Sequence, residues 1–134
     1  GRGLLMQGTR EWENYRVTAR MTPHMCEAGG LGIRVQGMTR YYALLLSQEG
    51  ARLVRSHEGK DTILASCDQG WKFGHQYELT LQAKGNKLTA WLNQEKILEM
   101  EDAEGYYPYG AMSLISQVGR IGCDFVEVQP AGNS

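Results

Sequence analysis

Residues 77–92 read Y-E-L-T-L-Q-A-K-G-N-K-L-T-A-W-L, and this stretch decides the fold class. In its first half, apolar and polar residues alternate, and a period of two is typical of a strand with one buried and one exposed face. Gly85-Asn86 follows, a pair that can take positive φ at both positions of a two-residue hairpin turn. Alternation then resumes, with Leu88, Ala90 and Leu92 on one face and Trp91 on the other. The stretch predicts a hairpin that needs neighbouring strands and a second layer over its apolar face.

The rest of the chain repeats this pattern at intervals of eight to twelve residues, about the spacing of short strands in sandwiches. Alternation and turn residues predict further strands over residues 4–7, 15–21, 31–36, 40–46, 51–56, 62–66, 96–101, 111–116 and 123–129. The run over 40–46 is apolar on both faces, which predicts a central strand. No segment has a helical period. We therefore expect an all-β fold, a two-sheet antiparallel jelly-roll sandwich; an immunoglobulin fold has fewer strands and a Cys-Trp-Cys spacing that is absent here.

Length and charge limit the classes of protein to consider. A chain of 134 residues suits one domain over residues 1–134, which we expect to be excised from a longer protein. Its formal charge is −1, with 14 basic and 15 acidic side chains, so it has no field to attract nucleic acid. No apolar run approaches the roughly 20 residues that span a bilayer, so we expect no membrane partner. The cellular location is left open.

We expect no metal and no other cofactor. The three cysteines lack C-x-x-C spacing, and the three histidines are scattered: Cys26, Cys67, Cys123, His24, His57 and His75. Phosphate-binding loops, nucleophile elbows and H-E-x-x-H motifs are absent from the sequence. We interpret the cysteines as small buried or half-buried residues, of which at most one pair could form a disulfide.

Five runs carry a resemblance to a known family: G-L-L-M-Q-G-T-R-E-W-E-N-Y at 3–15, G-I-R-V-Q-G at 32–37, R-Y-Y-A-L at 40–44, W-L-N-Q-E-K at 91–96 and G-C-D-F-V-E-V at 122–128. With them, nearly the whole chain resembles the concanavalin-A-like jelly roll of the lectin and glucanase type. More narrowly, it resembles the C-terminal sandwich domain of bacterial ADP-ribosylglycohydrolase-type enzymes and levan-binding-type carbohydrate modules. The resemblance implies a jelly roll and a catalytic domain of the parent protein as a partner. It transfers no site residue, because function is carried by sites rather than by folds.

One acidic run suggests an enzyme alternative. Laminarinase-type members of this superfamily carry Glu-x-Asp-x-(x)-Glu on a strand of the concave sheet, where the carboxylates act as nucleophile and acid/base. Here the run from Glu99 has Glu101 in place of aspartate, and Glu104 precedes a glycine. We interpret it as a solvated strand edge leading into a turn, and we expect no catalytic residue in this domain.

Candidate glycan-binding residues are those that offer an aromatic ring to a sugar or planar polar groups to its hydroxyls. Arg34 and Gln36 are expected on the polar face of one strand, joined by Tyr41 or Tyr42 and by Arg55 if the next strands pair in register. Trp91, on another strand, is either an exposed platform or a cover beneath a loop. The alternative is a solvated, arginine-rich sheet face without a ligand.

These observations predict a non-catalytic accessory module, carbohydrate-binding-like, attached to a larger hydrolase such as an ADP-ribosylglycohydrolase-type enzyme, with a glycan as its ligand. Two alternatives stay open, a laminarinase-type glycosidase and a purely structural spacer between domains. An open groove lined by Arg34 and a tyrosine would favour binding, and a filled or flat face would favour the spacer.

Overall fold

A computed structural model describes residues 2–7, 12–104 and 107–132. The described residues form eleven strands and no helix, as the alternation predicts. The strands are β1 (Arg2–Gln7), β2 (Tyr15–Pro23), β3 (Ala28–Gly37), β4 (Arg40–Leu46), β5 (Ala51–His57), β6 (Lys60–Cys67), β7 (Tyr77–Lys84), β8 (Lys87–Leu92), β9 (Glu95–Glu101), β10 (Ala111–Gln117) and β11 (Ile121–Pro130). The described residues contain no helix that could span a bilayer.

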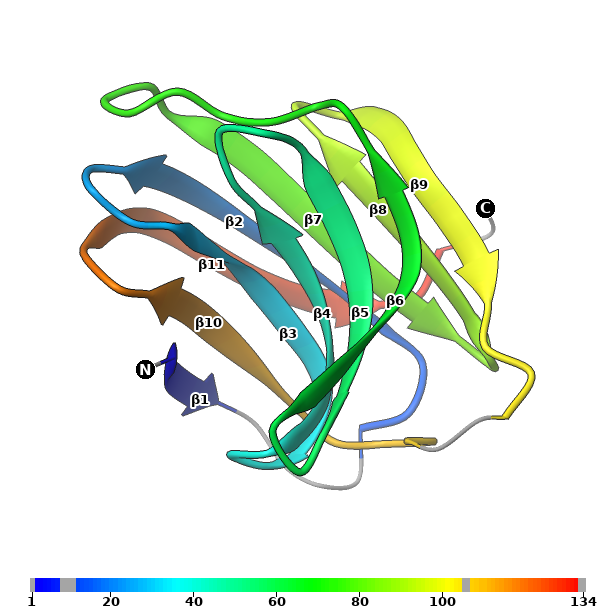
Figure 1. Cartoon of the computed structure of the whole chain (residues 1–134). Helices are drawn as coiled ribbons and strands as arrows, with labels where there is room; N and C mark the ends of the chain where they lie inside the picture. Colours follow the sequence, from blue (N-terminus) through cyan, green and yellow to red (C-terminus); the bar gives the residue numbers. More distant parts are fainter. Residues whose placement is uncertain (1, 8–11, 105–106, 133–134) are drawn as a thin grey trace.

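The strands form two antiparallel sheets that pack face to face (Figure 1). The six-stranded sheet has the order β1-β10-β3-β4-β5-β6, and the five-stranded sheet has the order β11-β2-β7-β8-β9. The first and last strands of the chain thus belong to different sheets, as in a jelly roll. The predicted fold class is confirmed.

The core lies between the sheets and contains the apolar face of the β7–β8 hairpin. Leu79, Leu81 and Ala90 are fully buried there. Gly85 has φ 58° in the two-residue turn, whereas Asn86 does not share the left-handed conformation that we predicted for both. The hairpin itself is confirmed, with Leu81 paired to Ala90.

The opposite face of β7 is less exposed than alternation suggests. Thr80 is 8% exposed, and its hydroxyl lies 3.1 Å from that of Thr18 on β2. Gln82 is 1% exposed, and its side-chain oxygen accepts hydrogen bonds from Arg16 Nε at 3.0 Å and from the Gly132 N–H at 2.9 Å. Neighbouring polar side chains and the end of the chain therefore cover this face.

The outer face of the six-stranded sheet is concave and holds a second apolar cluster. Strand β4 lies mid-sheet, as predicted, and is buried on both faces. Its inward residues join the core, whereas Tyr41, Ala43 and Leu45 point outward. These pack with Val35, Val54, Ala111 and Ile115, all at most 6% exposed. Because no described strand forms a second layer on this side, curvature and long side chains must exclude water from the cluster.

Candidate functional site

The predicted group of binding residues is not assembled in one place. Arg34 lies at a bulge in the pairing of β3 with β4 and has φ 52°. This bulge breaks the alternation that would have put Arg34 and Gln36 on a common open face, so that prediction is wrong. Gln36 lies beyond the bulge, partly exposed, and its amide donates to the Tyr109 carbonyl at 3.1 Å.

Arg34 is an internal connector, 2% exposed. Its guanidinium donates to the carbonyl oxygens of Glu13 at 3.0 Å, Gly85 at 2.5 Å and Tyr107 at 3.3 Å. Burial lowers the pKa of Arg34. A fourth hydrogen bond goes to the Asn14 side-chain oxygen at 3.2 Å. The side chain therefore ties three loops together at one end of the sandwich.

Tyr42 and Arg55 are also interior, because they pair across β4 and β5 on the face that looks toward the core. Both contact Asp102, which is 5% exposed. The Tyr42 hydroxyl donates to Asp102 Oδ2 at 2.7 Å, and Arg55 Nη1 lies 2.7 Å from the same oxygen. Burial acts to raise the pKa of Asp102, but the hydrogen bonds from Tyr42 and Arg55 and the charge of Arg55 outweigh it and lower that pKa. This cluster anchors the segment after β9.

Trp91 and Tyr41 lie on opposite outer faces of the sandwich. Trp91 is half-buried on the five-stranded sheet, with the Arg16 guanidinium 4.5 Å from its ring centroid, so one ring face is already occupied. Tyr41 is on the concave face, 2% exposed, and its hydroxyl accepts a hydrogen bond from Arg2 at 2.8 Å. Of the six predicted residues, Tyr41 is the one that the structure places in the concave floor.

The acidic run that suggested a glycosidase lies on the wrong sheet for that chemistry. Glu99 belongs to β9, an edge strand of the five-stranded sheet, and not to the concave sheet. Its carboxylate lies 3.2 Å from Lys96 and 3.4 Å from Lys87, and hydrogen bonds from these lysines lower its pKa. A general acid needs a raised pKa instead. Glu104 is ion-paired with Arg55 at 3.5 Å.

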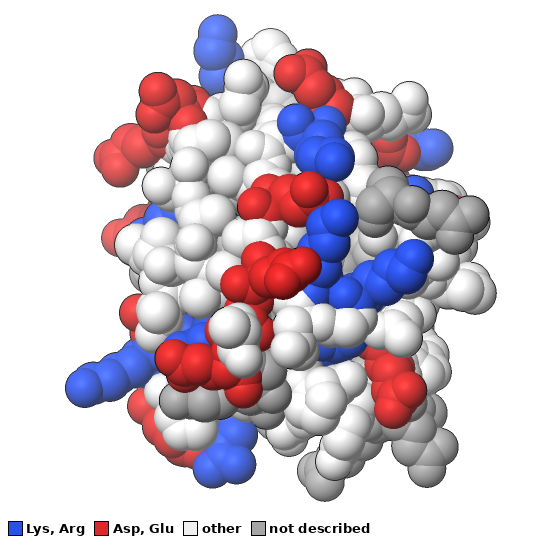
Figure 2. Space-filling model, turned by 90° about the vertical axis from the view of Figure 1, so that its right-hand side faces the viewer, with Lys and Arg blue, Asp and Glu red and all other residues white. Residues whose placement is uncertain are grey.

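The charges around this edge do not form a patch of one sign. Figure 2 shows acidic and basic side chains interleaved on the side of the molecule that carries β9. On β8 and β9, Lys87 and Lys96 each form an ion pair with Glu99. Such a surface gives no attraction for a polyanion.

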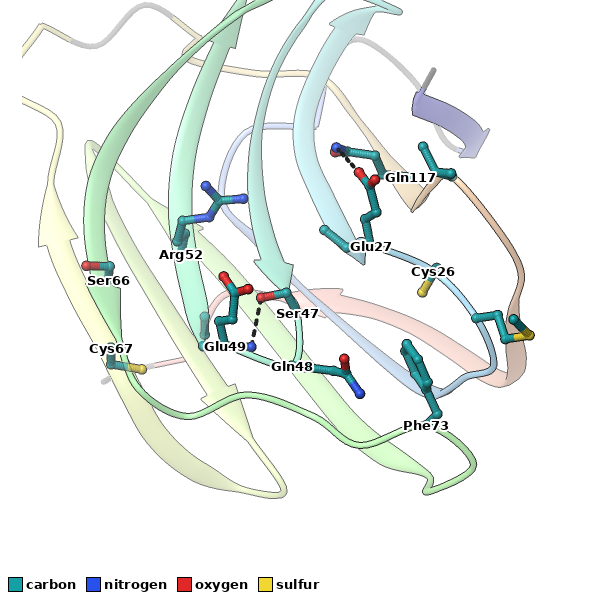
Figure 3. A pocket seen from close by; sticks show the side chains of 15 residues that line it. Cys26, Glu27, Ser47, Gln48, Glu49, Arg52, Ser66, Cys67, Phe73 and Gln117 are labelled. Atoms are coloured by element: carbon teal, nitrogen blue, oxygen red, sulfur yellow. Dashed lines mark hydrogen bonds between the residues drawn. The ribbon is translucent and has the colours of Figure 1, made fainter.

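A hollow of about 840 Å³ opens at one end of the concave face (Figure 3). It is bounded by the start of β3, the β4–β5 loop, β5, the end of β6, the loop before β7 and the end of β10. Its polar lining comprises Glu27, Ser47, Gln48, Glu49, Arg52, Ser66 and Gln117, and Phe73 contributes an aromatic ring. This is within the size range of small-molecule sites.

Arg52 is the main cation of the hollow. It follows Ala51 on β5 and points outward because the alternating residues Ala51 and Leu53 join the core. Its guanidinium makes no ion pair or side-chain hydrogen bond with the part of the chain that the structure describes, although its charge contributes to the lowered pKa of Asp61. Figure 3 shows the side chain directed over the hollow. An unpaired guanidinium offers up to five N–H donors in a plane.

Two loops shape the walls. The Trp71 N–H donates to the Ser47 carbonyl at 2.9 Å, and the Glu49 N–H donates to the Ser47 hydroxyl at 3.2 Å. A side chain at Gly70 would meet the Ser47 carbonyl oxygen at 2.5 Å, so only glycine permits this approach. Trp71 is 1% exposed and packs into the core at the end of the sandwich, whereas Phe73 is 39% exposed beside the hollow.

Sequence reasoning missed these residues because they meet only in three dimensions. Arg52 could have been recognised as the polar member of an alternating strand, but nothing local connects it to Glu27 or Gln117. The thiols of Cys26 and Cys67 also line the hollow; both are free, and burial raises the pKa of Cys26.

Comparisons with solved structures agree on the fold. The carbohydrate binding module CBM66 from Bacillus subtilis superimposes with a TM-score of 0.87 at 13% identity, over 96% of this chain and 82% of that one. The Caenorhabditis elegans galectin LEC-6 gives 0.71 at 8% identity, over 95% and 89%. Congerin II bound to lactose gives 0.73 at 8% identity, over 96% and 100%. No protein-family profile and no curated protein sequence matches the chain. The chain therefore has the sandwich fold seen in a carbohydrate binding module and in galectins.

Proposed function

We propose that this domain binds a glycan in the hollow at the end of the concave face. The observation that carries the proposal is the Arg52 guanidinium, which has no ion pair among the described residues and shares one hollow with two carboxylates, two carboxamides and an exposed Phe73 ring. Sugar hydroxyls both donate and accept, so they can pair with carboxylates and with a guanidinium at once. The ring offers an apolar surface to a sugar C–H face.

The names of the structural neighbours support this choice of ligand. One is a carbohydrate binding module, and another was solved with lactose. We further propose that the domain is a non-catalytic accessory of a larger hydrolase, such as an ADP-ribosylglycohydrolase-type enzyme, for which the sequence resemblance is the support. Sequencing the full open reading frame tests that part, because a neighbouring hydrolase domain is expected.

The experiment for binding is a glycan array, followed by calorimetric titration of the best ligand. We expect a dissociation constant between about 1 μM and 1 mM, because an open and hydrated site recovers little beyond the cost of association. Arg52→Ala and Phe73→Ala should each weaken binding about tenfold or more, as is typical of residues that dominate an interface.

Trp91→Ala is the matched control, because Trp91 lies on the other sheet and was also a sequence-based candidate. Its affinity should equal that of the wild type. If Trp91→Ala abolishes binding while Arg52→Ala does not, the site belongs to the five-stranded sheet. If the wild type binds no glycan at millimolar concentration, the proposal fails and the structural spacer is the better description.

A further inference from the structure

We infer that Arg2 and Asp61 are positioning residues that set the direction of the Gln117 amide, so that its N–H donors face the glycan hollow. The ligand in this inference is the glycan of the proposed function, whereas the orientation of the amide is argued from geometry alone. The three side chains and Glu27 form a continuous polar chain across the concave face.

Gln117 connects two hollows. It lines the 840 Å³ hollow described above and a smaller one of about 300 Å³, which Arg2, Tyr41 and Asp61 also line. It pairs with Arg2 in the β1–β10 ladder, so both side chains project from the same face of the sheet. Because Gln117 lines both hollows, contacts that fix its side chain in one hollow also fix the position of its amide in the other.

Arg2 fixes which end of the amide faces which way. Its Nε and Nη2 lie 3.2 and 3.0 Å from Gln117 Oε1. A guanidinium has donors and no acceptor, so only the amide oxygen can face it. The NH₂ group must then point to the opposite side, where Nε2 lies 3.4 Å from Glu27 Oε2 (Figure 3).

Arg2 is itself held from two further directions. Its Nη1 donates to the Tyr41 hydroxyl at 2.8 Å and lies 3.2 Å from Asp61 Oδ1, and its Nη2 lies 2.8 Å from Asp61 Oδ2. The guanidinium is thus bound in a fork by the carboxylate, with every nitrogen engaged. Because the guanidinium contacts side chains on β10, β4 and β6, it cannot rotate without breaking several of these hydrogen bonds.

For the glycan site, the consequence is one N–H donor of Gln117 with a fixed direction. An amide NH₂ group has two N–H bonds, and Glu27 accepts one of them. The second is left for an oxygen of the bound sugar, beside the Glu27 carboxylate that can accept from a neighbouring hydroxyl. Without Arg2 the amide oxygen loses its two donors, and the Gln117 side chain is free to turn away from Glu27 into other rotamers.

A double-mutant cycle with the best glycan tests the role in binding. Arg2→Met and Gln117→Leu should each lower affinity about threefold to tenfold, the range expected for a lost hydrogen bond. In the Gln117→Leu background, Arg2→Met should have no further effect, because the amide that it orients is gone. Asp61→Asn should reproduce part of the loss, and Arg40→Met, which removes an ion pair with Glu58 outside both hollows, should cause none. Additive effects of Arg2→Met and Gln117→Leu would overturn the inference.

A second measurement needs no glycan, so it separates this inference from the proposed function. In the free wild type, nuclear Overhauser effects should connect the Gln117 side-chain NH₂ protons to the side-chain protons of Glu27. These should weaken or vanish in Arg2→Met, provided that thermal melting shows a folded variant, and persist in Arg40→Met. Unchanged effects in Arg2→Met would show that Arg2 does not orient the amide, whether or not a glycan binds.

Discussion

Arg2 Nη2 lies 2.8 Å from Asp61 Oδ2, although β1 and β6 are the two edge strands of the six-stranded sheet. Five strand spacings separate these edges, roughly 24 Å across a flat sheet. The contact therefore requires the sheet to curl until its edges approach across the outer face. In Figure 1 the β5–β6 turn accordingly swings back toward β1. This curvature makes the face concave and explains how Tyr41 and Ile115 are excluded from water without a covering layer.

The Arg2–Asp61 pair should contribute modestly to stability. The side chains are 20% and 27% exposed, so Asp61→Asn should lower the free energy of unfolding by about 0.5–1 kcal/mol, within the range of partly exposed ion pairs. The hydrogen bond with Asp61 is the main cause of the raised pKa of Arg2. Urea denaturation at low and high salt checks the prediction, since a screened pair should contribute less at high salt. A loss above 3 kcal/mol would instead indicate that the whole six-stranded sheet depends on this pair for its curvature.

The buried Arg55–Asp102 pair should matter more and should depend on pH. Because the pKa of Asp102 is lowered in the folded state, its contribution is present above the unfolded value of about 3.9 and is lost as pH falls through the folded pKa. Asp102→Asn should cost about 3–5 kcal/mol at pH 7, because the variant removes the buried carboxylate closest to Arg55 and leaves the longer contact with the more exposed Glu104 to balance the Arg55 charge.

The measurement is the free energy of unfolding of wild type and Asp102→Asn between pH 7 and pH 3. The difference between them should shrink toward the acid end of this range. A difference that stays constant throughout would mean that Asp102 does not titrate with folding.

The central hairpin gives the largest effect expected from packing alone. Leu81→Ala should destabilise the fold by about 2–5 kcal/mol, because a fully buried leucine is replaced by a cavity. Lys84→Ala, at the exposed end of the same strand, is the control and should change stability by less than about 0.5 kcal/mol. Thr80 would be a poor control, because it is buried and contacts Thr18. Denaturant midpoints that rank Leu81→Ala and Lys84→Ala in the reverse order would contradict the assignment of faces.

The carboxylates of β9 and of the turn after it should have no catalytic role. The isolated domain is expected to hydrolyse no common β-glucan, and Glu99→Gln and Glu104→Gln should leave glycan binding unchanged, since neither residue lines the hollow. A reducing-sugar assay on a panel of β-glucans checks this. Turnover above buffer that disappears in either variant would make the domain an enzyme.

The fold could be predicted from sequence because alternation and turns are local properties. Leu79, Leu81 and Ala83 fall on one face whatever surrounds them, and the apolar run of β4 requires a central position. The candidate site could not be predicted in this way. A single bulge at Arg34 reverses the face of a residue, and bulges depend on tertiary contacts such as the Tyr15 hydroxyl, which accepts the Arg34 N–H at 2.6 Å. The curvature of the six-stranded sheet could not be predicted either. It brings together residues far apart in the sequence, such as Arg2 and Asp61, which are 59 residues apart.

Arg34→Ala distinguishes most sharply between the site predicted from the sequence and the proposed site in the hollow, because the two give Arg34 different roles. As a sugar ligand on an open face, its loss would abolish binding and leave stability unchanged. As the buried connector of three loops, its loss leaves the carbonyls of Glu13 and Gly85 without their donor. Arg34→Ala should therefore lower the free energy of unfolding by about 3 kcal/mol or more, in the range for several lost hydrogen bonds from a charged group.

Arg40→Ala is the control for Arg34→Ala, because Arg40 is exposed and its ion pair with Glu58 should contribute at most about 1 kcal/mol. Urea unfolding measures the stabilities, and titration well below the melting temperature of the variant measures glycan affinity in the folded state. That affinity should match the wild type within a factor of about two, because Arg34 lies outside the hollow. An Arg34→Ala protein of full stability that no longer binds glycan would return the site to the face of β3 where the alternation first placed it.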